Sequence, residues 1–448
     1  MTSHTVVHRR NEREAAEAAG PALREADVRQ LSERLGEPAW LAERRQAAWK
    51  AYQTLPLPTT ADESWRRTDL RGLALGQLVP APADESPVEP GWVGPLAREG
   101  DGALLIVRPG REEKRAGGAA LAESGVVFKE WKQAVRENGD QVRAALGTVV
   151  PDAETKFSAL AAAAAETGVV LVVPPGVQLR SPLHSILWAP GSGGLFPTRA
   201  LIVLGEGASA AVVHETASPD APDGQACHTG IVEIVVGAGA QLKLVELQNW
   251  GRHVWSFSHE RARLEAEASL EWVIGAVGSR LAKSFNTLDL AGQGAQARIS
   301  GLCAADGLQH FDYVTRQNHL AEHTTSDLLF KGALWGHSRS VWQGMIYVAP
   351  GAQKADGYQA NRNLMLSKEA RADSLPGLEI LADDVRCSHG ATVGQLEEEP
   401  VFYSMSRGLG FQDAARLIVG GFFEPVLQRI PFESLRERLK LILDAKMG

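Results

Sequence analysis

The chain has 448 residues, of which 44% are hydrophobic and 22% charged, a globular composition that excludes wholesale disorder. Its 46 Lys and Arg residues against 54 Asp and Glu residues give a formal net charge of −8. This acidic balance argues against non-specific binding to nucleic acid or to an anionic membrane. Three cysteines are too few for a disulfide framework, which favours a reducing compartment.

The N-terminus does not resemble a targeting signal. Arg9 and Arg13 alternate with Glu12 and Glu14, whereas transit peptides are poor in acidic residues and signal peptides need an apolar stretch. The most apolar runs elsewhere are cut short by turn residues, as at Pro174, so a membrane span is not expected. The expected location is the cytoplasm.

Residues 12–53 are rich in Ala, Glu, Arg and Leu, which predicts helices. The Pro-rich stretch 80–95 predicts a surface connection, and Phe157–Ala165 predicts an Ala-rich helix. We therefore expect residues 1–168 to form an N-terminal region that is helical with Pro-rich connections.

From residue 169 the pattern changes to short β-rich runs separated by Gly and polar turns. Small residues recur just after turns at Ala208, Ala240, Ala268 and Ala295, which are 32, 28 and 27 residues apart. Such a period fits a β-solenoid, in which each coil stacks on its neighbours. A β-sandwich with unrelated Gly-Ala turns is the alternative. The expected β region spans residues 169–400.

The last part of the chain, residues 401–448, is expected to form a C-terminal helical domain. One helix carries an apolar stripe before Pro425, and the last helix carries a row of leucines. The stripe consists of Ala414, Leu417, Ile418 and Phe422, and the row consists of Leu435, Leu439 and Leu443. These faces could pack on the solenoid or bind a partner.

Cys387 and His389 stand out among the residues that could carry chemistry. Two positions apart on a strand, they would project from the same face as a pair of candidate ligands for iron or zinc. Two ligands cannot complete a tetrahedral site, so the others would come from elsewhere in the chain, a second subunit or an incoming cluster. Taken alone, the spacing favours a small buried cysteine beside a hydrogen-bonded histidine.

Other candidate residues are weaker. Six acidic and histidine residues between positions 306 and 327 have a spacing that matches no known metal motif, which favours polar strand edges and turns. They are Asp306, His310, Asp312, His319, His323 and Asp327. Cys227, His228 and Cys303 look structural. The chain lacks the motif G-x-x-x-x-G-K-[ST], so it does not hydrolyse ATP through such a loop, and it also lacks G-x-G-x-x-G, G-x-S-x-G and C-x-x-C.

The run Leu378–Gly394, LEILADDVRCSHGATVG, resembles the signature of the SufD branch of the SufB/SufD family of iron–sulfur cluster assembly scaffolds. Other stretches are similar to family motifs in the same order: Glu63–Leu70, Trp342–Val348, Lys354–Asp356, Asn361–Leu366 and Phe402–Gly408. Gly390 follows His389 where SufB proteins have Glu, which favours SufD over SufB.

The resemblance implies a mainly β fold: a right-handed parallel β-helix core flanked by N-terminal and C-terminal helical regions. It implies a scaffold without enzymatic activity that works with a SufB-like paralogue and the ABC-type ATPase SufC. No cofactor would be held permanently, and a transient iron–sulfur cluster or iron would lie at the SufB–SufD interface. His389 matches the better supported of the family's two candidate assembly residues, and Cys387 matches the other.

Several alternatives stay open. A β-helix polysaccharide-active enzyme needs paired carboxylates, but Asp383 and Asp384 are adjacent and would point to opposite faces of a strand. A metal-storage or metal-sensing protein would use residues 310–323. The expected ATPase contacts lie in the C-terminal region, at Arg407, Gly408, Leu417 and Phe422. The sequence does not decide whether the isolated chain is a monomer or a homodimer, or whether a flavin binds the complex.

Overall fold

The computed structural model describes residues 23–81, 102–115, 121, 123–189, 191–221 and 223–447. The helices predicted before residue 23 and most of the Pro-rich stretch 80–95 lie outside the described residues. The helices are α2 (Glu25–Leu35), α3 (Ala39–Thr54), α6 (Trp131–Glu137), α7 (Gly139–Ala145), α8 (Lys156–Ala164), α9 (Glu398–Ser406), α10 (Phe411–Leu427) and α11 (Glu433–Lys446), with short 3-10 helices at Glu63–Trp65 and Leu75–Gln77.

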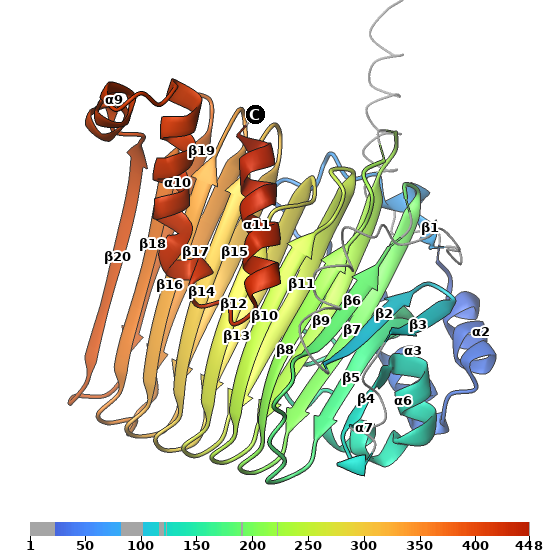
Figure 1. Ribbon diagram of the computed structural model, residues 1–448. Coiled ribbons are helices and arrows are strands. Elements are labelled where there is room, and N and C mark those ends of the chain that lie inside the picture. The colour runs from blue at the N-terminus through green and yellow to red at the C-terminus, as the bar shows by residue number, and fades with distance from the viewer. Residues whose placement is uncertain are drawn as a thin grey trace, which may run out of the picture.

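The strands form two long sheets (Figure 1). They are β1 (Val79–Pro80), β2 (Ala103–Arg108), β3 (Arg111–Arg115), β4 (Val127–Glu130), β5 (Thr167–Val173), β6 (Leu183–Trp188), β7 (Gly194–Leu204), β8 (Ser209–Ala217), β9 (Ala226–Val236), β10 (Gln241–Asn249), β11 (Val254–Leu264), β12 (Ser269–Ala276), β13 (Leu281–Leu290), β14 (Gln296–Ala305), β15 (His310–His319), β16 (Thr325–Leu334), β17 (Arg339–Val348), β18 (Asp356–Met365), β19 (Arg371–Ile380) and β20 (Arg386–Gln395).

From β5 to β20, successive strands alternate between the two sheets and pair in parallel with the strand two places away in sequence. The odd-numbered strands run from β5 to β19 in one sheet, and the even-numbered strands run from β6 to β20 in the other. Parallel strands reached through alternate sheets make a coil that advances one strand spacing per turn. The predicted β-solenoid is therefore confirmed, and the sandwich alternative is wrong.

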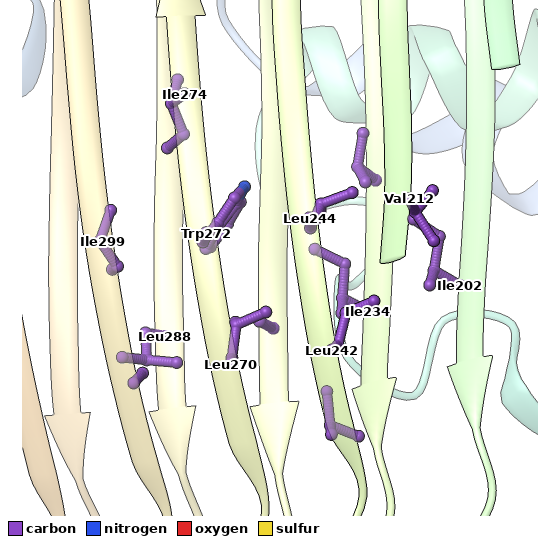
Figure 2. Close-up of a cluster of buried hydrophobic side chains, with 14 of the residues drawn as sticks. Ile202, Val212, Ile234, Leu242, Leu244, Leu270, Trp272, Ile274, Leu288 and Ile299 are labelled. Atoms are coloured by element: carbon purple, nitrogen blue, oxygen red, sulfur yellow. The ribbon is translucent and has the colours of Figure 1, made fainter. Parts of the chain in front are cut away.

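The interior of the solenoid follows the period of two along each strand. On β10, Leu242 and Leu244 point into the lumen while Lys243 points outward. Leu244 lies in register with Trp272 of β12, so apolar side chains stack from coil to coil (Figure 2). The alanines at 208, 240, 268 and 295 are fully buried, as the repeat predicted, because the corner of each coil leaves little volume for a side chain.

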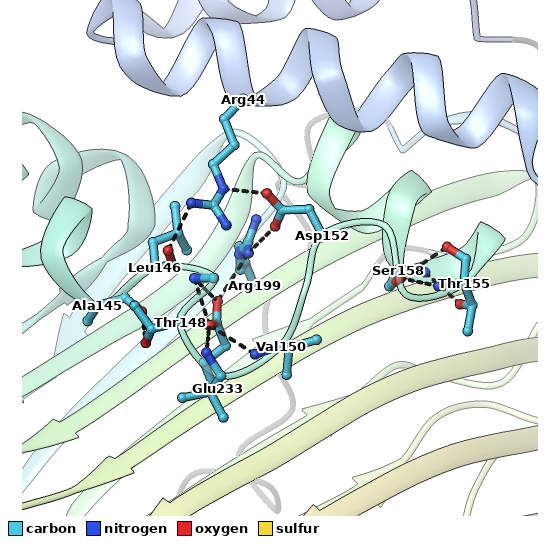
Figure 3. Close-up of polar contacts among 12 residues, drawn as sticks. Arg44, Ala145, Leu146, Thr148, Val150, Asp152, Thr155, Ser158, Arg199 and Glu233 are labelled. Atoms are coloured by element: carbon cyan, nitrogen blue, oxygen red, sulfur yellow. Dashed lines mark hydrogen bonds and ion pairs between the residues drawn. The ribbon is translucent and has the colours of Figure 1, made fainter.

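The N-terminal region contains strands as well as helices. β2 and β4 extend the two sheets beyond β6 and β5, and the sequence pattern did not indicate them. A network of charges joins this region to the solenoid (Figure 3). Glu233 accepts backbone N–H groups, including that of Gly147 at 2.7 Å, and pairs with Arg199 at 3.1 Å. Arg199 in turn pairs with Asp152 at 2.5 Å. The boundaries at residues 168 and 400 remain predictions.

In the C-terminal region, α10 and α11 lie across the outer face of the even-numbered sheet (Figure 1). The row Leu435, Leu439 and Leu443 is buried, as predicted. Of the predicted stripe on α10, Ala414 is buried, Ile418 and Phe422 are half-buried and Leu417 is 61% exposed. The face that α10 buries consists of Ala414, Val419, Phe423, Val426 and Leu427. The helix continues through Pro425, and its buried face is displaced from the predicted one by about one residue.

Candidate functional site

The last coil of the solenoid ends in two strands that each have a free edge among the described residues. β19 pairs with β17 and β20 pairs with β18, and no described strand pairs with their other edges (Figure 1). Each of these strands has ten residues. The coil therefore presents two long rows of backbone N–H and C=O groups without a partner strand.

Cys387 and His389 lie on the lumen side of β20. Cys387 is in register with Gly357 and His389 with Gln359, and both of these β18 residues are buried. Side chains in register on neighbouring parallel strands point the same way, so the two candidate ligands share one face. Within the part of the chain that the structure describes, no further coil covers them, which is why His389 is exposed and Cys387 only half-buried.

Although β20 is an edge strand, the Cys387 side chain is half-buried in the lumen. Its surroundings are apolar, with Ile346, Val348 and Ala355 in the same cluster. A side chain at Gly357 would come within 3.3 Å of the Cys387 sulfur, so the glycine leaves the thiol room to turn inward. Burial raises the pKa of the Cys387 thiol, which disfavours the thiolate that would bind a metal.

The rim around this pair is apolar. Leu378 and Ile380 of β19 are in register with the buried residues Ile346 and Val348 of β17. In any inner coil such positions would be covered by the next strand, yet here they remain exposed, together with Leu381 and Val393. Exposed apolar surface of this kind, next to unpaired strand edges, marks a surface made for contact.

The pair cannot hold a metal unaided. Among the described residues there is no group of three or more His, Cys, Asp or Glu side chains placed to bind one ion. Sulfur and imidazole ligands suit iron and zinc, and a tetrahedral site needs four ligands. An ion or cluster at His389 therefore needs ligands from outside this part of the chain.

The six residues between 306 and 327 do not gather into a site. Asp312 pairs with Lys283 at 2.7 Å, and Asp306 pairs with Lys446 at the same distance. The two ring nitrogens of His319 are engaged by hydroxyls of Thr324 and Ser326, each at 2.8 Å. Asp306, Asp312 and His319 therefore make structural contacts, as the spacing predicted, whereas the side chain of His323 is exposed.

The remaining sequence candidates are also structural. His228 is held by hydroxyls of Thr198 and Ser256, each at 2.9 Å. Cys227 and Cys303 are buried, and burial raises the pKa of both thiols, to about 12 for Cys303. Asp384 lies in the turn before β20, where it pairs with Lys354.

A second exposed surface surrounds α9 and the start of α10. A cavity of about 440 Å³ lies between α9 and the ends of β18 and β20, lined by Met365, Leu396, Val401, Phe402, Met405 and Phe411. Phe402 is 73% exposed and Phe411 60%. The sequence analysis did not predict that these two phenylalanines are exposed contact residues. Their position on either side of the Arg407-Gly408 turn could have indicated it.

The four residues predicted to contact an ATPase are spread along this region. Arg407 and Gly408 end α9, with the Arg407 guanidinium 5.2 Å from the centre of the Tyr403 ring. Leu417 is exposed on α10. Phe422 is half-buried, and the Lys331 ammonium group lies 4.7 Å from the centre of its ring. Arg407, Gly408 and Leu417 are accessible for docking, whereas Phe422 packs partly against the solenoid.

Comparison with known proteins gives the same family that the sequence motifs indicated. Residues 188–422, more than half of the chain, match the family model described as "SUF system FeS cluster assembly, SufBD core domain". The chain is 28% identical to the iron–sulfur cluster assembly protein SufB of Bacillus subtilis over 93% of this chain and 91% of that protein. It is 29% identical to an iron–sulfur cluster assembly SufBD family protein of Staphylococcus epidermidis over 94% of this chain and 92% of that protein.

Proposed function

Because the chain belongs to the SufB/SufD family of iron–sulfur cluster assembly proteins, we propose that it is the SufD-type subunit of a scaffold and not an enzyme. Its relatives carry both SufB and SufBD names, so the SufD assignment rests on the motif Cys387-Ser388-His389-Gly390. The scaffold acts in the cytoplasm, where three unpaired thiols are compatible with a reducing environment.

The observation that carries the proposal is the open end of the solenoid. A SufB-like paralogue docks on the free edges of β19 and β20 and on the apolar rim formed by Leu378, Ile380 and Val393. When alone, two copies of the chain can pair through the same rim as a homodimer. The edge strands supply main-chain hydrogen bonds, and the rim supplies apolar area.

His389 is the ligand that this chain contributes at that interface. Its imidazole is exposed, on the lumen face of a strand, where a docked chain would stand directly opposite. A neutral imidazole ligates iron through one nitrogen while the other donates a hydrogen bond that fixes the ring. Cys387 is an auxiliary ligand, because its thiol is half-buried and its pKa is raised. The cluster or iron is cargo that is assembled and passed on.

The ATPase partner SufC docks on the surface around α9 and α10. The support is an apolar cavity with exposed Phe402 and Phe411 beside Arg407, and Leu417 exposed further along α10, in a chain without its own phosphate-binding loop. The test is a pull-down of SufC by chains carrying Phe402→Ser or Leu417→Ser. Leu441→Ser on α11 is the matched control, since Leu441 is equally exposed but lies away from the cavity. Undiminished SufC binding by the Phe402 and Leu417 variants would contradict this part of the proposal.

The role of His389 is tested by co-expressing His389→Ala with the SufB and SufC partners and measuring complex yield, bound iron and bound sulfide. Ser388→Ala is the control, because Ser388 neighbours His389 but points out of the lumen. We expect an intact complex with little cluster for His389→Ala and normal cluster for Ser388→Ala. Cys387→Ala should give a weaker defect. Normal cluster content in His389→Ala would disprove the ligand role, and loss of the complex would make His389 structural.

A further inference from the structure

Two glutamate side chains point into the lumen of the solenoid, where most neighbours are apolar. Glu246 lies on β10 and Glu260 on β11, two strands that are consecutive in the chain but belong to opposite sheets. Both side chains line the same cavity. Glu260 is in register with Asn286, and Glu246 is in register with His214 and Ile274. A buried charge is costly unless it is neutralised, so two carboxyl groups in one interior require an explanation.

The contacts of the two carboxyl groups divide their roles. The indole N–H of Trp272 donates to Glu246 at 2.7 Å. Glu260 accepts from the side-chain amide of Asn286. The two carboxyl groups line the same cavity and lie within hydrogen-bonding reach of each other. Two carboxylates are both acceptors, so a bond between them needs a proton, and Glu246, the more deeply buried of the two, is the member that carries it.

The groups that face the pair supply no compensating positive charge. His214 of β8 and His228 of β9 are neutral, because burial lowers their pKa values to about 4 and about 3. Burial raises the pKa of Tyr313 of β15 and of Cys303 of β14, so both stay uncharged. Lys283 of β13 is already paired with Asp312. Burial likewise raises the pKa of both Glu246 and Glu260.

A cavity of about 50 Å³ adjoins the pair, lined by both glutamates, Ser284 and Tyr313. Tyr313 is 3% exposed and lines the same cavity, so its phenol group lies beside the two carboxyl groups. A cavity with several polar groups in its wall can hold water that hydrogen-bonds to them. The volume is enough for at least one water molecule, since one water needs roughly 10–15 Å³ of such space.

We propose that Glu246 and Glu260 hold one proton between them and bind water in the cavity they share with Tyr313, which makes the solenoid interior sensitive to pH. At neutral pH, Glu246 donates its O–H to the Glu260 carboxylate, and water joins the pair to the Tyr313 hydroxyl. At alkaline pH the shared proton leaves through the cavity water to solvent. Two negative charges then face each other in the lumen, and the coil of β10 and β11 loosens.

The test uses infrared spectra of the full chain with ¹³C-labelled glutamate, recorded from acidic to alkaline pH. We expect the carbonyl stretch of one protonated glutamic acid to persist at neutral pH and to disappear at alkaline pH. Glu246→Gln, which keeps the shape of the protonated group, should lose this band. Glu271→Gln is the control, since Glu271 lies half-exposed on the outer face of β12, in register with Lys243.

Thermal unfolding supplies the second measurement. The Tm of the wild-type chain and of Glu271→Gln should fall between neutral and alkaline pH, and this fall should be much smaller in Glu246→Gln. Absence of a protonated glutamic acid at neutral pH, or a band that Glu246→Gln leaves unchanged, would overturn the proposal. If Glu246→Gln does not fold, the wild-type spectra alone decide, because a band missing at neutral pH refutes the shared proton.

Discussion

Replacing Arg438 with Met should strongly destabilise the attachment of α11 to the solenoid. The Arg438 guanidinium contacts both carboxylate oxygens of Glu215 on β8, at 2.7 and 2.6 Å, and Glu215 is fully buried. The imidazole of His184 lies 3.3 Å from the same carboxylate. Methionine keeps most of the length of the arginine side chain but removes its charge, leaving a buried carboxylate without its cation.

Breaking a buried ion pair in this way typically costs about 3–5 kcal/mol in the free energy of unfolding. Burial raises the pKa of Glu215, but the Arg438 charge and the His184 hydrogen bond outweigh burial and hold the pKa below its usual value. The pair therefore contributes stability above the pKa of an unfolded glutamate, and this contribution is lost as pH falls through the folded value. Without Arg438, burial raises the pKa of Glu215, so the carboxylate of the variant takes up a proton as the pH falls below neutral. The cost of Arg438→Met should therefore be largest at neutral pH and should shrink toward mildly acidic pH.

The assay is urea denaturation of the wild type, Arg438→Met and the double variant Arg438→Met/Glu215→Leu at neutral and mildly acidic pH. The double variant should recover much of the lost stability, because no buried charge remains. A cost below about 1 kcal/mol for Arg438→Met, typical of an exposed pair, would refute the reasoning. A cost that does not change with pH would refute it as well.

Three further predictions concern the solenoid. Ala240→Leu overfills the corner of a coil and should lower the free energy of unfolding, measured by urea denaturation, by at least about 1–3 kcal/mol. Gln241→Leu, on the exposed face, should lower it little. Equal losses for the two variants would contradict a filled lumen. Burial lowers the pKa values of His228, His259 and His310 to about 3, so the unfolded chain binds more protons than the folded one between about pH 6.5 and 3. Stability should therefore decrease as the pH is lowered through that window, by up to about 1.4 kcal/mol per pH unit per histidine. A Tm independent of pH there would disprove neutral buried histidines. Gly357→Ala places a methyl group 3.1–3.3 Å from Ile346, His319 and Cys387. This crowding should push the Cys387 thiol outward and speed its alkylation by iodoacetamide. An alkylation rate equal to that of the wild type would contradict the placement of the thiol beside Gly357.

Periodicity carried much of the fold prediction. A recurring small residue identifies the corner of a coil because the lumen there excludes larger side chains, as at Ala208 and Ala240. The hydrophobic pattern did not predict the structure where burial depends on which other element packs against a segment. The run Ala103–Val107 is uniformly buried as β2, and a short apolar run does not reveal which strand will cover it. On α10, Leu417 and Val419 are both apolar, and the sheet surface determined which one is buried.

The candidate site was predictable to a similar extent. The spacing of Cys387 and His389 predicted that both lie on one face of a strand, and they do so on β20. This was predictable because the alternation of side chains along a strand depends only on the local backbone. The unequal exposure of the two side chains was not predictable. It depends on β20 being the last strand of its sheet and on Gly357 leaving space beneath Cys387, which are properties of the assembled coils. The apolar rim at Leu378 and Ile380 likewise looks like an ordinary buried strand until the missing next coil is seen.

If a partner docks on the open end as proposed, the geometry of that end would link assembly of the complex to assembly of the cluster. A solenoid could protect its last coil with charged or short edge strands, but β19 and β20 are full-length and expose Leu378, Ile380 and Val393. Such an end is favourable only when another chain covers it. A chain that pairs with β20 would cover the apolar rim and, in the same step, bring its own side chains next to His389. The ligands that two residues of this chain cannot supply would then become available only in the assembled scaffold, and a cluster could form only where a partner is present to receive it.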